Sequence, residues 1–256
     1  MNLRTINKTT IREFESIGEM VSFLDASPEN NQYPERSSQN RDQKFSMTYN
    51  YKEAMSLLLN GWSEAASKMT TTLKTAPQPI HTKQMRSTYS VAGHTASVPR
   101  YLQGIPTSMI ASVPDRRKQP VVVINHSISY HAGWKAESIL QEGIKALQIV
   151  QALEASNRNV KLNIICIASQ GSTKRGFKVT IKQPGERLNI SKMAFPLAHP
   201  SMLRRMFFRY MEVEPDMPFH FSGYGAPCNE DCPQIYPKEM YIPEKIDIEK
   251  FFKEIS

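Results

Sequence analysis

The chain has 256 residues, of which 40% are hydrophobic and 22% are charged, the mixture of an ordinary globular protein. No apolar run approaches the roughly 18–20 residues that a membrane-spanning helix needs, and the first residues contain no apolar signal core, so we expect neither membrane insertion nor export. The three cysteines, Cys166, Cys228 and Cys232, are too few and too unevenly placed for a disulfide framework, which favours a reducing cytoplasm.

The net charge of +8 is distributed unevenly along the chain. Residues 171–210 carry nine basic groups and one acidic group, a net of +8, whereas the last 46 residues carry four basic and ten acidic groups, a net of −6. A basic window of this kind is typical of a surface that binds an acidic partner, most often nucleic acid. The side chains that we consider for contact with DNA or RNA are Lys174, Arg175, Lys178, Lys182, Arg204, Arg205 and Arg209.

The first half of the sequence predicts helices and irregular segments. Residues 11–24 place apolar side chains at helical spacing and predict a short amphipathic helix. Residues 26–46 are polar and contain two prolines, which indicates a linker or long loop. A second helix is predicted from Asn50, which can cap its start, to about Met69. Residues 74–120 are rich in proline and turn residues, so no regular element is expected there, and such a segment can wrap the core.

The clearest pattern begins at Val121. Residues 121–124 are an apolar, β-branched run that predicts a strand buried on both faces. Apolar residues from Ile139 to Leu153 then fall on one helical face, and residues 160–167 predict a second buried strand. This strand, helix and strand form a βαβ-like unit, which predicts an α/β fold with a mostly parallel sheet flanked by helices.

The remaining residues predict shorter elements. Alternating apolar residues at 177–190 indicate a hairpin whose turn lies at 183–186. A helix is predicted at about 200–211 and a short strand near 219–221. Residues 226–244 read as an acidic loop that contains prolines, and a helix follows to the end of the sequence.

The residues after the first buried strand, Asn125-His126-Ser127-Ile128-Ser129, resemble the start of a von Willebrand factor A-type (VWA) domain. In that family a buried strand ends in Asp-x-Ser-x-Ser, and these side chains, with a threonine and an aspartate from later loops, hold a divalent cation that a partner's carboxylate completes. Ser127 and Ser129 match the two serines, and Thr173 and Asp216 are candidates for the later ligands by order alone. Asn125 replaces the aspartate and offers no charge, so Mg²⁺ would bind weakly or not at all, and we expect no cofactor.

The VWA resemblance covers roughly residues 117–225. It implies a VWA-like (Rossmann-type) α/β domain at 114–256 that includes the C-terminal helix, preceded by a mainly helical or irregular region at 1–113 that contains the polar linker. Three other stretches resemble an uncharacterised family common in tailed-bacteriophage genomes: TYNYKEAMSLLLNGW, SVAGHTASVPRYLQGIPTSMI and AHPSMLRRMFFRYME. This second resemblance implies a phage or prophage origin and a role in the host cytoplasm during infection, and it brings no established activity.

Histidine and cysteine patterns offer weaker candidates. His126 and His131 flank the Ser-x-Ser loop, and a metal or catalytic role for them needs a third ligand such as His199. Cys228 and Cys232 lack the second close pair that a zinc site requires. Ordinary loop histidines and a solvated acidic loop are the simpler interpretations.

No enzyme signature stands out. Residues 171–178 lack the Gly-Lys-Ser/Thr that ends a phosphate-binding loop, and no Ser-His-Asp order or pair of carboxylates is evident. We therefore expect a non-enzymatic protein that acts as an interaction or assembly adaptor, with an unidentified protein partner, through Asn125, Ser127 and Ser129. The alternative is a nucleic-acid-binding protein of phage replication or host takeover that uses the basic window. A hydrolase or nuclease would require a carboxylate cluster that the sequence does not display.

Overall fold

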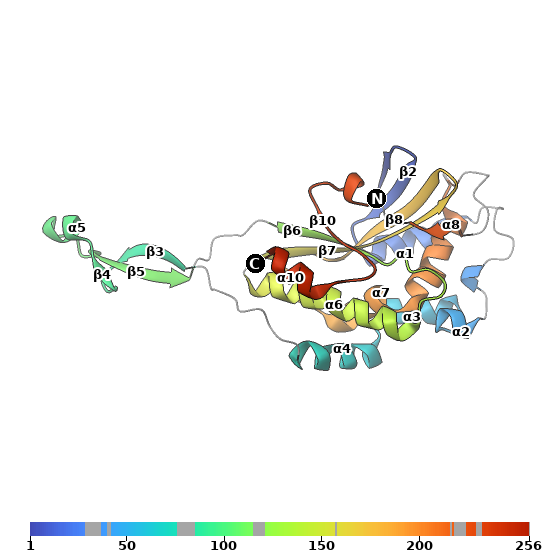
Figure 1. Cartoon of the computed structure of the whole chain (residues 1–256), viewed down its shortest axis with the longest axis horizontal. Coiled ribbons are helices and arrows are strands. Elements are labelled where there is room, and N and C mark those ends of the chain that lie inside the picture. The colour runs from blue at the N-terminus through green and yellow to red at the C-terminus, as the bar shows by residue number, and fades with distance from the viewer. Residues whose placement is uncertain are drawn as a thin grey trace.

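The computed structural model describes residues 1–28, 37–39, 42–75, 85–114, 121–156, 158–215, 217, 224–228 and 232–255. Its body contains a seven-stranded mixed sheet in the order β1-β2-β8-β7-β6-β10, with β9 paired to β7. A separate three-stranded sheet, β3-β5-β4, projects from the body (Figure 1). The predicted α/β class, a sheet flanked by helices, is confirmed. Within the described ranges no helix has both the length and the apolar character that a membrane crossing needs.

The elements have the following bounds. The strands are β1 (Asn2–Ile6), β2 (Thr9–Phe14), β3 (Met85–Ser90), β4 (Thr95–Ala96), β5 (Met109–Pro114), β6 (Val121–Ser127), β7 (Asn159–Gln170), β8 (Thr173–Lys182), β9 (Ala226–Pro227) and β10 (Met240–Ile242). The helices are α1 (Ile17–Ala26), the 3₁₀ turn η1 (Ser37–Gln39), α2 (Gln43–Ser46), α3 (Tyr51–Asn60), α4 (Ser63–Thr75), α5 (Val98–Leu102), α6 (Ala136–Ala155), α7 (Ile190–Ala198), the π-helical segment η2 (Met202–Phe207), α8 (Phe208–Val213), α9 (Cys232–Ile235) and α10 (Ile248–Ile255).

The predicted βαβ unit is present as β6, α6 and β7. The two strands are parallel neighbours, with Val121 opposite Asn159 and Ser127 opposite Ile165. Strand β10 pairs in parallel with the other side of β6, so the carboxyl end of β6 lies between two strands. This placement covers the end of the first predicted strand on both sides.

Strand β7 shows how the two faces of the sheet are packed. Ile164 and Cys166 face the main core, which α6, α7 and the η2–α8 helix cover. Ile165 and Ile167 face a smaller core that α9 completes with Cys232. The uninterrupted apolar run of β7 follows from this burial on both faces.

The N-terminal segment begins in the main sheet. The helix predicted over residues 11–24 is confirmed from Ile17, where α1 begins, and wrong at residues 11–14, which belong to β2. Strand β2 runs parallel to β8, and Ser16 caps the start of α1 by accepting a hydrogen bond from the Glu19 amide at 3.1 Å. Ile11 and Phe14 have helical spacing in sequence, but on the strand they point to opposite faces and enter different cores. Residues 1–113 are therefore not a helical region separate from the sheet.

The predicted helix from Asn50 to Met69 is two helices. Asn50 caps α3 as expected, accepting a hydrogen bond from the Glu53 amide at 2.9 Å. Gly61 ends α3 with φ +90°, and α4 starts two residues later. Half-buried Trp62 packs edge-on against His199, with ring centroids 4.6 Å apart. The described part of the predicted linker at 26–46 contains η1 and α2.

The predicted hairpin at 177–190 is also wrong in its position. Strand β8 pairs antiparallel with β7 through a turn at 171–172, where Gly171 has φ +58°. Residues 183–186 do form a turn, but it leads into α7 and not into a strand. The predicted acidic loop at 226–244 contains β9, α9 and β10, and the strand predicted near 219–221 lies outside the described residues.

Candidate functional site

The loop predicted to form an interaction surface is buried. Asn125, Ser127 and Ser129 are 1%, 0% and 2% exposed, because β7 and β10 flank the end of β6. Ser129 Oγ accepts a hydrogen bond from the Ile167 amide at 3.0 Å and donates to Cys166 Sγ at 3.7 Å. A partner's carboxylate cannot reach these side chains without rearrangement of the sheet edge, which corrects the expected adhesion-like surface.

The Asn125 side chain belongs to a polar network inside the sheet. Its Nδ2 donates to Glu239 at 2.6 Å, and its Oδ1 accepts from Asn163 Nδ2 at 2.9 Å. Thr180 continues the row by donating to Asn163 Oδ1 at 2.9 Å, and Lys178 Nζ donates to Glu239 at 2.9 Å. An amide donates and accepts at once, and an ionised carboxylate only accepts, so the network accounts for asparagine at this position.

A second group of charged and aromatic side chains adjoins this network. Tyr236 donates from its hydroxyl to Glu13 at 2.8 Å, and Lys178 Nζ lies 3.8 Å from the centre of the Tyr236 ring. Arg4 reaches the same Glu13 carboxylate at 3.2 Å. Burial raises the pKa of Tyr236, whose hydroxyl therefore stays protonated. The carboxylates at this place are compensated by cations and donors.

The basic window predicted to bind nucleic acid points largely inward. Lys178, Lys182, Arg204 and Arg205 are 8%, 1%, 4% and 0% exposed. Lys182 Nζ pairs with Glu154 at 2.6 Å. These four cations lie buried inside the protein, so the predicted phosphate-binding surface lacks most of its charge.

The arginines of the η2–α8 helix hold distant loops in place. Arg205 donates from Nε to Thr48 Oγ1 at 2.9 Å and from Nη1 to the Ser38 carbonyl at 2.9 Å. Arg209 donates to the Leu24 carbonyl at 3.3 Å. Lys174 and Arg175 lie half-buried near the β7–β8 turn. Only these last two hairpin residues lie where the prediction needs accessible charge.

The predicted metal-binding side chains do not converge. His126 is fully buried, and its burial lowers its pKa to about 4, as burial also does for His199. His131 is exposed, and Thr173 begins β8, whereas Asp216 lies outside the described residues. Among the described residues no three histidine, cysteine or acidic side chains form a group able to hold a metal ion. Burial raises the pKa of the Cys166 thiol, which is therefore neutral.

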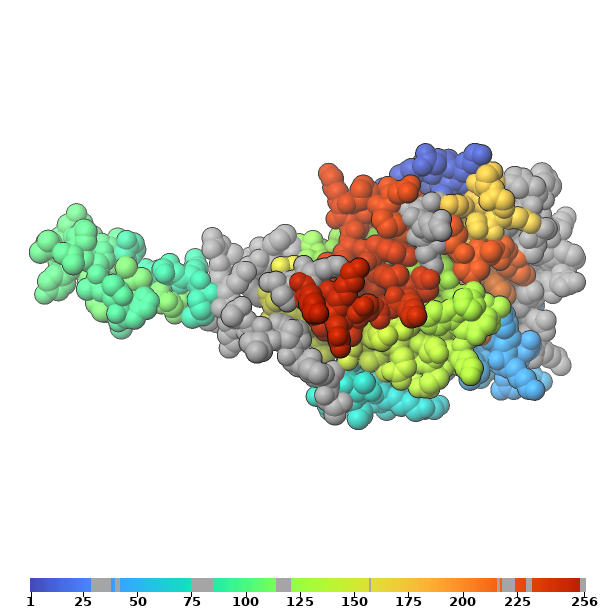
Figure 2. Space-filling model, viewed as in Figure 1, coloured from blue at the N-terminus to red at the C-terminus, as the bar shows by residue number. Residues whose placement is uncertain are grey.

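The projecting arm, residues 85–114, is the candidate that sequence reasoning missed. It was expected to lack regular structure, yet β3, β5 and β4 pair antiparallel and α5 lies near its tip. No side chain at 85–113 is buried. Figure 2 shows the arm standing clear of the body. It carries half of the large hydrophobic residues that are exposed in the described part of the chain: Met85, Tyr89, Val91, Val98, Tyr101 and Leu102.

The charge of the arm is as distinctive as its apolar surface. It contains no Asp or Glu, and its permanent charges are Arg86 and Arg100. Arg100 donates to the Thr107 carbonyl and hydroxyl, both at 2.9 Å, and lies 4.3 Å from the centre of the Tyr89 ring. The absence of acidic residues over thirty positions was the sequence signal that could have indicated this surface.

These observations define a class: a mixed α/β protein with a closed polar network in its sheet and a projecting β-arm. Residues 2–255 match the family described as "Domain of unknown function (DUF7192)", and the chain belongs to that family. No curated protein and no solved structure matches it.

Proposed function

We propose that the protein is an interaction or assembly adaptor whose arm docks into an apolar groove, bordered by carboxylates, on a partner protein. The observation that supports this function is an ordered sheet in which no described side chain at 85–113 is buried. A small sheet gains stability by burying a hydrophobic face, and an exposed apolar patch that projects from a protein marks an interaction site. A partner supplies the missing cover.

The chemistry of the arm favours a protein over nucleic acid. Affinity for nucleic acid comes largely from cations that neutralise phosphates, and the arm offers two arginines, of which Arg100 is engaged within the arm. Tyr101, 71% exposed, is of a residue type enriched in protein interfaces, and Leu102, 78% exposed, adds apolar surface beside it. The lack of acidic residues and the net charge of +8 complement a carboxylate-lined border.

The setting that we propose is an infected host cell, following the resemblance of residues 48–62, 90–110 and 198–212 to tailed-phage proteins. The second of these stretches lies within the arm. Arm-mediated contact with another protein is compatible with assembly or takeover roles in that setting. The interaction surface proposed is the arm, and not Asn125, Ser127 and Ser129.

The test places a photo-crosslinking amino acid at Tyr101 in cells that naturally produce the protein, identifies the crosslinked partner and reconstitutes the purified pair. We expect Tyr101→Ser with Leu102→Ser to weaken binding at least tenfold, and arm amides to gain protection from hydrogen exchange in the complex. The matched control is Tyr49→Ser with Leu59→Ser, which removes two side chains of the same kinds that are each 51% exposed on the body.

Three outcomes would overturn this function. Reconstituted binding that the arm variant leaves unchanged would move the interface to the body. Arm-dependent dimerisation in sedimentation experiments, with no other protein present, would replace the partner by a second copy of the chain. Salt-sensitive binding of DNA or RNA that requires Arg86 and Arg100 would make the arm a nucleic-acid element.

A further inference from the structure

A pocket opens at the carboxyl ends of β6 and β7, away from the arm. Open α/β sheets bind ligands at this edge, outside the ends of their parallel strands. The loop after β6 supplies Tyr130 and Ala132, β7 supplies Cys166, and the η2–α8 helix supplies the facing wall. The pocket measures about 130 Å³, close to the roughly 150 Å³ cavity that holds a benzene molecule.

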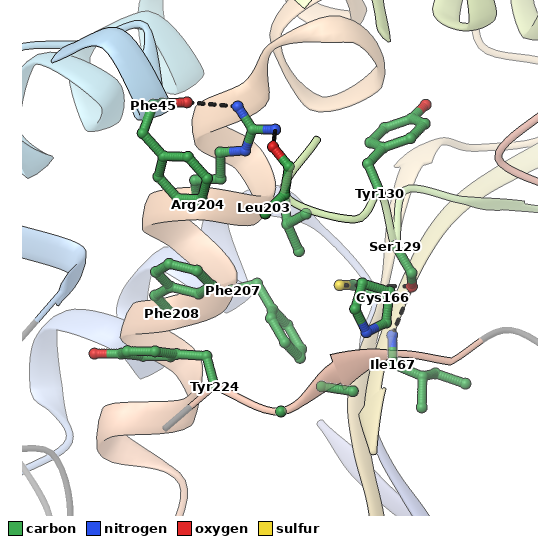
Figure 3. Close-up of a pocket in the computed structure, with 14 residues that line it drawn as sticks. Phe45, Ser129, Tyr130, Cys166, Ile167, Leu203, Arg204, Phe207, Phe208 and Tyr224 are labelled. Atoms are coloured by element: carbon green, nitrogen blue, oxygen red, sulfur yellow. Dashed lines mark hydrogen bonds between the residues drawn. The ribbon is translucent and has the colours of Figure 1, made fainter. Parts of the chain in front are cut away.

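One wall of the pocket is aromatic (Figure 3). The rings of Phe208 and Tyr224 are stacked with centroids 4.0 Å apart and planes 25° apart, and Phe45 lies beyond Phe208 at 6.4 Å. Leu203 and Phe207 complete the apolar surface opposite Cys166. Flat rings bind well against such a wall because they gain both apolar burial and favourable ring geometry.

Arg204 puts a positive charge into this apolar wall. Arg204 is only 4% exposed. Its Nη atoms donate to the Phe45 carbonyl at 2.5 Å and to the Trp134 carbonyl at 3.0 Å. Nε has no hydrogen-bond partner in the described part of the protein, and no described carboxylate pairs with this guanidinium, whose pKa burial lowers. A buried cation without an anion is costly, so the pocket favours a ligand that brings one.

The other polar groups of the pocket indicate binding without covalent chemistry. Ser129 Oγ already makes hydrogen bonds with the Ile167 amide and the Cys166 sulfur, and the buried Cys166 thiol is neutral. Neither is an activated nucleophile. The arrangement therefore suits recognition of an intact small molecule.

We propose that this pocket binds a small planar carboxylate, with its carboxylate at the Arg204 guanidinium and its apolar ring against Phe207 and Phe208. The site is independent of the arm and requires no partner protein. Benzoate is the probe, because its ring matches the volume of the pocket and its charge matches the guanidinium. Benzamide keeps the ring without the charge, and acetate keeps the charge without the ring.

The experiment measures binding of the three probes to the full-length protein by ligand-observed NMR and calorimetry. We expect benzoate to bind at least tenfold more tightly than benzamide or acetate. Arg204→Gln should abolish the preference for benzoate over benzamide, and Arg187→Gln, at an exposed arginine, should leave it unchanged. If loss of Arg204 impairs folding, Ala132→Trp provides a second test. Ala132 is an exposed residue on the rim of the pocket, so the larger side chain should block benzoate binding there.

Each contrary result has a definite meaning. No benzoate binding at millimolar concentration, or equal binding of benzamide, would refute the role of Arg204. Acetate binding as tightly as benzoate would refute the role of the aromatic wall. Benzoate binding that survives Ala132→Trp would place the ligand elsewhere on the protein.

Discussion

Restoring the aspartate of the VWA-type pattern tests whether Asn125 is a lost metal ligand or a structural residue. In Asn125→Asp the amide that donates to Glu239 at 2.6 Å becomes a carboxylate beside a carboxylate. Two unit charges about 3 Å apart repel by about 5 kcal/mol at an effective dielectric constant of 20. The Glu239 side chain is 24% exposed and can turn partly toward solvent, so we expect a net loss of about 2–3 kcal/mol of folding stability at pH 7.

The pH dependence of this variant follows from the same geometry. Repulsion raises the pKa of the introduced carboxyl in the folded state above its unfolded value of about 3.9. The folded state therefore favours the protonated form, so the penalty is absent below about pH 4 and grows as pH rises toward the folded-state pKa. Urea unfolding at pH 4, 5 and 7, with and without Mg²⁺, measures it, and exposed Asn60→Asp is the matched control. Stability equal to wild type, or stabilisation of the variant by Mg²⁺, would refute the structural role and favour a metal site.

Three further substitutions or conditions give checkable results. Gly61→Ala should lower folding stability by about 2 kcal/mol, or the melting temperature by about 4–8 °C, because φ is +90° and the new methyl group would lie 2.7 Å from Ser191 Oγ. Gly18→Ala, where the nearest atom lies at 3.8 Å, is the control, and equal melting temperatures of the two variants would contradict the reasoning. Folding stability should fall as pH drops from 6.5 to 4, by up to about 1.4 kcal/mol per pH unit for His126, because its folded-state pKa of about 4 lies below its unfolded value. If His126→Leu left the slope of unfolding free energy against pH unchanged, this contribution of His126 would be excluded. A thiol reagent should modify half-buried Cys228 before Cys166 in the native protein, and the reverse order, read by mass spectrometry, would show that the pocket thiol is reactive.

The sequence predicts the centre of the fold because local patterns there have one physical meaning. A β-branched run at 121–124, a long apolar helical face and a second apolar run together predict a βαβ unit, and the structure has it. Burial on both faces was wrong for the start of the first run, because Val121 is 48% exposed and full burial begins at Ile124. Ile11 and Phe14 defeat the same method, since a spacing of three fits one helix face and equally fits two faces of a strand. Only pairing with β8, more than 160 positions away in sequence, decides between the two.

The charged residues could not be assigned from sequence for a related reason. Arg205 bonds to Thr48, 157 positions away, and Arg12 donates to Glu214, 202 positions away. Composition counts cations without saying whether they face solvent or the interior. The basic window is therefore real as a sequence feature, but much of its charge is used inside the protein. Arg204, Arg205 and Arg209 bond to segments that meet the η2–α8 helix. Lys178 and Lys182 pair with Glu239 and Glu154.

The arm and the pocket are physically separable, which makes their proposed roles separable as well. Neither hydrophobic core contains a described residue of the arm, so changes at Tyr101 or Leu102 remove no packing from the body. Arg204, in contrast, joins α2 at Phe45 to the loop after β6. A ligand at its guanidinium would stabilise that junction by binding only the folded state. A small carboxylate should therefore raise the melting temperature of the body while the arm remains as exchangeable as before. Adaptor binding should protect the arm and leave the affinity of the pocket unchanged.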